Sequence, residues 1–140
     1  MRRLPVYILL DTSGSMRGEP IEAVKVGLGA LVSSLRQDPS ALESVYLSIL
    51  TFDREAKVIA PLTSLEDFQI PDLETTSGPT HTGLALKQLC DCVDHDLVKS
   101  TGEQKGDWKP LMFLMTDGTP SDLQVYNEQV PRVRSRDLRR

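Results

Sequence analysis

The residues best suited to chemistry form a short polar run that follows the apolar residues 6–10. Asp11, Ser13 and Ser15 carry oxygen-bearing side chains at alternate positions. Alternate residues of an irregular loop can turn toward one point, and we expect Gly14 to allow a tight fold by adopting a positive φ. Oxygen ligands of this kind suit Mg²⁺, which prefers octahedral oxygen coordination. We therefore predict a site for a hard cation at this loop.

Two later segments offer further oxygen ligands. Thr80, with Thr82 as the alternative threonine, lies in a loop before a predicted helix, and Asp117 follows the apolar residues 111–115. Asp11 and Asp117 would give the site only two formal negative charges, since hydroxyl ligands are neutral. A cation held in this way stays electrophilic and can accept a carboxylate from outside. We expect Mg²⁺ there, with Mn²⁺ and Ca²⁺ as alternative ions.

Alternating strands and helices must position these segments. The continuous apolar runs at residues 6–10 and 111–115 are typical of strands covered on both faces. Apolar residues at steps of three and four predict one helix from about Pro20 to Asp38. The same spacing predicts a second helix over residues 82–98.

Residues 45–52 and 56–62 predict two strands that only a short turn separates. Such a turn forces antiparallel pairing, because a parallel crossover needs about a dozen residues or more. The order of elements therefore predicts an α/β domain whose sheet is mostly parallel with one antiparallel edge strand. Ligands bind such sheets beyond the carboxyl ends of the strands, where residues 11 and 117 lie.

Other chemistries fit the same loop less well. A calcium-binding loop that starts at Asp11 would need glycine where Met16 stands. An aspartyl nucleophile would need a second acid where Ser13 stands, and a serine nucleophile would need a base such as His81. We keep a Mg²⁺-dependent phosphohydrolase using Asp11 as the alternative function, and a metal-free scaffold as a third.

Length and charge exclude several classes of protein. The chain has 140 residues and a formal charge of −4, which predicts one domain and disfavours a nucleic-acid binder. An excess of positive charge is found only locally, in residues 132–140 with five Arg and one Asp, and the rest of the chain is acidic on balance. The apolar residues 6–10 are too few for a signal peptide or a membrane span. Cys90 and Cys92 do not suit a disulfide framework, so we expect a cytoplasmic protein with no membrane contact.

The three segments together resemble the metal-ion-dependent adhesion site of von Willebrand factor type A domains, which carries Asp-x-Ser-x-Ser, a threonine and an aspartate in this order. The resemblance implies a Rossmann-like sheet with helices on both faces, and a non-enzymatic interaction module. It implies that Ser13, Ser15 and Thr80 contact the ion through their hydroxyls. It also implies that Asp11 and Asp117 bind the ion directly or through water, and that a partner's Glu or Asp completes the shell.

Residues 3–118 also resemble the TerY-type proteins of bacterial tellurium-resistance systems. That resemblance implies a cytoplasmic scaffold in a stress response, acting alongside a protein kinase and a phosphatase. Domains of the wider family usually have six strands, whereas four are predicted here, so we expect residues 1–140 to be one truncated domain. The strand at residues 111–115 would then be an uncovered edge through which two copies could pair.

Overall fold

The computed structural model describes residues 3–75, 78–96, 107, 110–116 and 127–132. Within them, a four-stranded sheet has the strand order β3-β2-β1-β4. The strands are β1 (Leu4–Asp11), β2 (Val45–Phe52), β3 (Ala56–Ser64) and β4 (Leu111–Met115). β1 pairs in parallel with β2 and β4, and β2 pairs antiparallel with β3. The predicted sheet, mostly parallel with one antiparallel edge strand, is confirmed.

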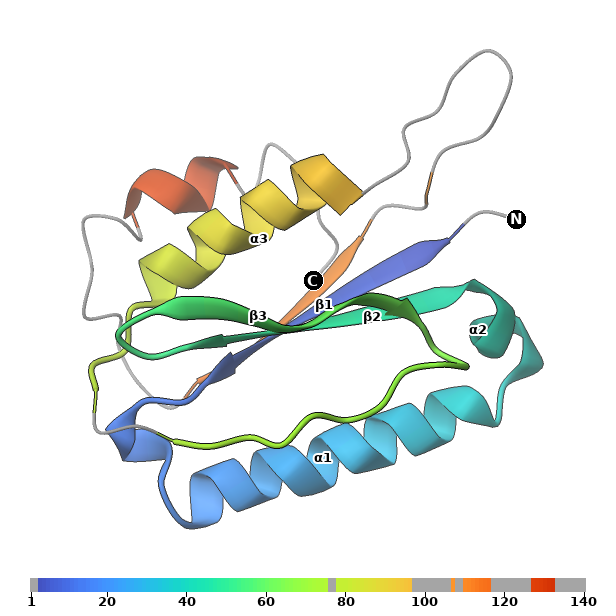
Figure 1. Ribbon diagram of the computed structural model, residues 1–140, viewed down its shortest axis with the longest axis horizontal. Helices are drawn as coiled ribbons and strands as arrows, with labels where there is room; N and C mark the ends of the chain where they lie inside the picture. The colour runs from blue at the N-terminus through green and yellow to red at the C-terminus, as the bar shows by residue number, and fades with distance from the viewer. Residues whose placement is uncertain (1–2, 76–77, 97–106, 108–109, 117–126, 133–140) are drawn as a thin grey trace.

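Helices cover both faces of this sheet (Figure 1). They are α1 (Glu19–Arg36), α2 (Pro39–Ser44) and α3 (Thr82–Asp96), and a 3-10 turn η1 (Gly14–Met16) precedes α1. Residues 127–132 are also helical. Both predicted long helices are confirmed over their described residues. The short α2 was not predicted; the Asp38 carboxylate accepts a hydrogen bond from the Ser40 N–H and so caps its first turn.

The alternation of side chains along β1 divides the core into two layers. Val6, Ile8 and Leu10 pack in the cluster that includes α1, whereas Tyr7 and Leu9 pack in the cluster that includes α3. Seven of the eight residues of β1 are buried. The prediction that this apolar run is covered on both faces is therefore confirmed, and its carboxyl end is held rigidly between two helical layers.

The second apolar run behaves differently. None of the five residues of β4 is buried, and Phe113 and Leu114 are 39% and 37% exposed. The prediction that this strand is covered on both faces is wrong for the described part of the chain. The reason is its position, because among the described strands β4 stands last in the sheet order and pairs only with β1. The expectation of an edge strand at residues 111–115 is confirmed.

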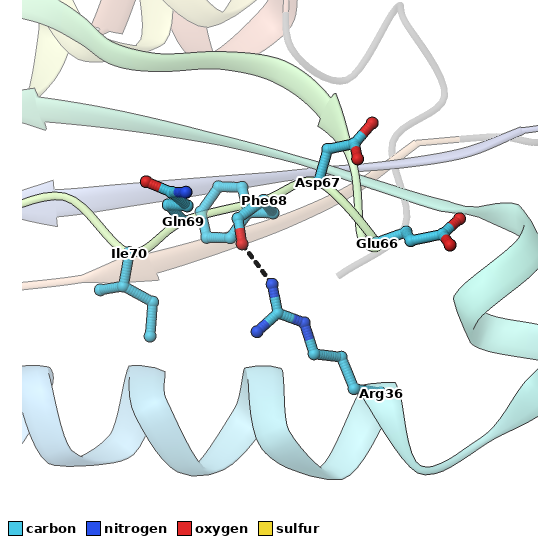
Figure 2. A pocket seen from close by; sticks show the side chains of 6 residues that line it. All are labelled: Arg36, Glu66, Asp67, Phe68, Gln69 and Ile70. Atoms are coloured by element: carbon cyan, nitrogen blue, oxygen red, sulfur yellow. Dashed lines mark hydrogen bonds between the residues drawn. The ribbon is translucent and has the colours of Figure 1, made fainter.

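Residues 65–75, which we call the return segment, run alongside α1 between β3 and the loop before α3 (Figure 1). Leu65, Phe68 and Leu73 anchor the return segment in the α1-side core. Arg36 of α1 donates hydrogen bonds to the carbonyls of Leu65 and Phe68, beside a pocket that residues 66–70 also line (Figure 2). These contacts lead the chain back toward the carboxyl ends of the strands, where Thr80 lies.

No helix within the described ranges is both long enough and apolar enough to cross a membrane.

Candidate metal centre

Asp11 is the last residue of β1, and its side chain is completely buried. One carboxylate oxygen, Oδ1, accepts a hydrogen bond from the Ser13 N–H at 2.8 Å. The other, Oδ2, accepts one from the Thr116 hydroxyl at 2.7 Å. Among the described residues, no Lys, Arg or His side chain forms an ion pair with this carboxylate. Within the described residues, the carboxylate is therefore buried against neutral donors.

The three hydroxyls of the predicted site gather beside this carboxylate. The Oγ atom of Ser13 lies 3.1 Å from Ser15 Oγ and accepts a hydrogen bond from Thr80 Oγ1 at 2.9 Å. Ser13 and Thr80 are buried, whereas Ser15 is exposed. The structure thus brings Asp11, Ser13, Ser15 and Thr80 into one hydrogen-bonded group, although Thr80 is 67 residues from Ser13 in the chain.

The fifth predicted ligand, Asp117, lies outside the described residues. Its neighbour Thr116 is described, and the contact of Thr116 with Asp11 brings the chain to the site one residue before position 117. Thr116 is not among the predicted ligands. Its place beside Asp117 after an apolar strand was the only signal that could have identified it.

The loop after β1 is shaped by local hydrogen bonds. The Thr12 N–H donates to the Phe52 carbonyl at 2.9 Å, which extends the pairing of β1 with β2, and the chain then enters η1. The Gly14 N–H donates to the Gly78 carbonyl at 3.2 Å and joins this loop to the loop of Thr80. The expectation of a positive φ at Gly14 is wrong. Among the described glycines Gly18 alone has one, because the sharp turn falls at the start of α1.

The two candidate threonines have different surroundings. Thr80 donates its hydroxyl hydrogen bond to Ser13, as a member of the site should. The hydroxyl of Thr82 is buried at the start of α3 and has no hydrogen-bond partner in the part of the chain that the structure describes. Burying a hydroxyl without a partner costs free energy. Thr80 therefore belongs to the hydrogen-bonded group of hydroxyls and Thr82 does not. The choice of Thr80 as the ligand stays a prediction.

The donor set fits a hard cation. It consists of one carboxylate and three hydroxyls, all of them oxygen ligands of the type that Mg²⁺, Mn²⁺ or Ca²⁺ accepts. The described residues contain no cluster of three or more His, Cys, Asp or Glu side chains that could hold a metal. Any ion here would therefore depend on hydroxyl ligands and on the single buried carboxylate of Asp11, with residue 117 as the further acid.

Comparison with known proteins gives the same picture of the fold. The profile of the von Willebrand factor type A domain matches residues 6–140. An uncharacterized protein of Synechocystis is 40% identical over 130 residues; the match covers 84% of this chain and 26% of that protein, so the chain spans about a quarter of this relative's length.

Two solved structures share the fold at low sequence identity. Proximal thread matrix protein 1 from the mussel byssus superposes with a TM-score of 0.70 at 16% identity, covering 98% of this chain and 36% of that one. The pilus adhesin SpaC from Lactobacillus rhamnosus GG superposes with a TM-score of 0.65 at 19% identity, covering 86% of this chain and 15% of that one.

Proposed function

The chain belongs to the von Willebrand factor type A domain family, whose members often mediate protein–protein interactions, and from this premise we propose that it is a Mg²⁺-dependent interaction module. Asp11, Ser13, Ser15, Thr80 and Asp117 would hold the ion, and a Glu or Asp of a partner protein would complete its shell. The observation that supports this proposal is the Asp11 carboxylate, which is fully buried and has no cationic partner among the described residues. The Ser13 residue that donates its N–H to this carboxylate also carries a hydroxyl that is hydrogen-bonded to the Thr80 hydroxyl.

The ligand types explain why such an ion would recruit a partner. Three neutral hydroxyls withdraw little of its positive charge, so a bound Mg²⁺ would supply an electrophilic centre for an incoming carboxylate. The proposed ligands differ in solvent exposure: Asp11 is fully buried, whereas Ser15 is exposed. A partner would therefore approach from the side of Ser15.

The same geometry disfavours the phosphohydrolase alternative. A nucleophilic aspartate needs an oxygen that can reach the phosphorus atom of a substrate. Both oxygens of Asp11 accept hydrogen bonds from within the protein, and its side chain has no exposed surface. Ser13 also occupies the position where that chemistry would place an acid. The proposed role is binding, with no turnover.

The biological setting of the proposal rests on sequence resemblance. We place the module in the cytoplasm, in a bacterial tellurium-resistance or stress-response system, with an associated kinase or phosphatase as the partner that supplies the acid. The proposal includes no nucleic-acid or membrane ligand.

A Mg²⁺-dependent pull-down tests the proposal. The tagged chain should retain a partner from cell extract in the presence of Mg²⁺ and release it when EDTA is added. Asp11→Ala should retain none, and the wild type should hydrolyse no phosphate ester under the same conditions. Retention that is equal with Mg²⁺ and with EDTA would contradict the metal-dependent mechanism, and turnover lost in Asp11→Ala would favour the enzyme.

The proposal also includes self-association through β4. This strand ends the sheet within the described residues, and its Phe113 side chain is 39% exposed. Unpaired edges of this kind present free backbone donors and acceptors to a second copy. Light scattering that shows a monomer at high protein concentration would exclude such pairing.

A further inference from the structure

Asp53, in the turn between β2 and β3, touches both loops that carry proposed metal ligands. Its carboxylate oxygen Oδ2 accepts a hydrogen bond from the Thr12 hydroxyl at 2.8 Å. Its backbone carbonyl accepts one from the His81 N–H at 2.9 Å. Figure 1 shows this turn, η1 and the start of α3 at the same end of the sheet. One residue outside the predicted site therefore joins segments that are far apart in the chain.

The turn that carries Asp53 is itself held firmly. The Asp53 N–H donates to the Glu55 carbonyl at 3.0 Å, and the Glu55 N–H donates back to Asp53 Oδ1 at 3.2 Å. The ring nitrogen Nδ1 of His81 lies 2.9 Å from the Arg54 carbonyl, which adds a second contact between the turn and the loop before α3. Both oxygens of the Asp53 carboxylate are thus engaged, and the turn can act as a fixed support.

The residues that Asp53 holds are sequence neighbours of proposed ligands. Thr12 stands between Asp11 and Ser13, and His81 follows Thr80. We propose that Asp53 is a positioning residue of the metal site, which sets the distance between the residue 11–15 loop and the residue 80 loop before the ion arrives. This inference rests on the proposed function, because it assigns a support to the same site.

A hydroxyl-rich site needs such a support more than a carboxylate-rich one does. Neutral hydroxyls attract a cation weakly, so they cannot draw two separate loops together without loss of affinity. Direct bonds between the loops exist at Gly14–Gly78 and Ser13–Thr80, but Ser13 and Thr80 must turn their hydroxyls toward the ion when it binds. The Thr12–Asp53 bond involves no proposed ligand and can persist in both states.

Mg²⁺ titration of variants tests this role. Asp53→Ala should weaken Mg²⁺ binding by about tenfold or more, the usual loss when a residue that orients metal ligands is removed. Thr12→Val, which removes the hydrogen bond and changes no charge, should give a similar loss, and Thr12→Ser should restore affinity. The double variant should bind no more weakly than either single one, because both changes remove the same contact.

Two further measurements separate positioning from charge and from misfolding. In Mg²⁺-free protein, amide hydrogen exchange at Ser13, Ser15 and His81 should accelerate in Asp53→Ala while the exchange of β1 amides stays at the wild-type rate. Glu55→Gln is the matched control, because Glu55 lies in the same turn and, within the described ranges, its side chain pairs only with exposed Lys57, at 3.6 Å. This control should leave both the exchange rates and the affinity unchanged.

The outcomes are distinguishable. Equal loss of affinity in Glu55→Gln and none in Thr12→Val would show a long-range charge effect and overturn the positioning role. Wild-type affinity in Asp53→Ala and Thr12→Val would also overturn it while leaving the proposed function intact. Absence of Mg²⁺ binding by the wild type would overturn the proposed function and this inference together.

Discussion

The two ends of the sheet each bury an aspartate, but they neutralise its charge differently. Near the amino end of β1, the Asp107 carboxylate receives two hydrogen bonds from the Arg3 guanidinium, at 2.9 and 2.6 Å, and its side chain is only 3% exposed. This contact raises the pKa of Arg3. At the carboxyl end, Asp11 is fully buried and, from the residues that the structure describes, receives hydrogen bonds from one N–H and one hydroxyl.

The difference lies in how each buried carboxylate is compensated. A buried carboxylate is costly unless an opposite charge compensates it. The amino-end cluster holds its own cation, and the Arg3 guanidinium also stacks 5.1 Å from the ring centroid of Tyr46 and donates to the Asp96 carbonyl. The carboxyl-end cluster has no such cation among the described residues. On the proposed function, a bound Mg²⁺ would supply the compensating positive charge at the carboxyl end.

Replacing Asp11 should have the largest effect. Wild-type protein at a Mg²⁺ concentration of a hundred times its Kd gains about 2.7 kcal/mol of stability from the ion. Asp11→Ala should lose all of that gain, because Asp11 supplies the only carboxylate of the site among the residues that the structure describes. Thermal unfolding with and without Mg²⁺ measures the difference. A Mg²⁺-dependent shift of wild-type size in the variant would show that the ion binds elsewhere.

Replacing Asp107 should destabilise the fold without touching the metal. Asp107→Ala should cost about 2 kcal/mol, less than for a fully buried ion pair because Arg3 is 25% exposed. Urea unfolding should show this loss equally with and without Mg²⁺. Lys25→Ala is the control, since its exposed pair with Glu22 should contribute under about 0.5 kcal/mol. A loss that depends on Mg²⁺ would break the distinction between the two ends.

The two threonines near the site sharpen the comparison further. Thr80→Val should weaken Mg²⁺ binding by about tenfold, or about 1.4 kcal/mol, because a ligand hydroxyl is lost. Thr82→Val should leave the affinity unchanged and should not lower stability, because the hydroxyl it removes is buried without a partner. Isothermal titration of both variants with Mg²⁺ measures these affinities. Weaker binding by Thr82→Val together with unchanged binding by Thr80→Val would make Thr82 the ligand.

The smallest predicted effect is on the pH dependence of the free energy of unfolding, and it involves Tyr7. Burial, followed by the charge of Asp96, raises the pKa of Tyr7 above its ordinary value of about 10. A raised folded-state pKa means that this stability is present below pH 10 and is lost as the pH rises above it, because the unfolded chain releases its proton first. Between pH 9 and pH 10.5 the wild type should lose about 0.8 kcal/mol more than Tyr7→Phe.

Denaturant unfolding across this pH range measures that difference. It should be the same with and without Mg²⁺, because Tyr7 contacts Asp96 and lies in the amino-end cluster. If the unfolding free energies of the wild type and Tyr7→Phe changed in parallel with pH, the predicted contribution of the Tyr7 hydroxyl would be contradicted.

Local patterns predicted most of the fold for identifiable reasons. The period of apolar residues predicted α1 and α3, and the turn at Asp53–Glu55 was too short for anything but an antiparallel pair. The patterns failed where a property depends on neighbours in space. Residues 6–10 and 111–115 are equally apolar, yet the first run lies inside the sheet and the second at its edge.

The candidate site shows the same limit. Asp11, Ser13 and Ser15 could be identified from their spacing, and Thr80 from its family motif, because these signals lie within a few residues. The contacts of Thr12 with Asp53 and of Thr116 with Asp11 could not, because they join residues 41 and 105 positions apart. No local pattern encodes such pairs.

The amino-acid sequence by itself determined the order of strands and helices and the supply of oxygen ligands, because both depend on side-chain chemistry over short stretches. Only the tertiary structure decided that Asp11 is buried with no cationic side chain paired to it among the described residues, and that the turn residue Asp53 hydrogen-bonds to both Thr12 and His81. Burial and charge compensation are properties of packed surroundings, and those surroundings exist only when distant segments have come together.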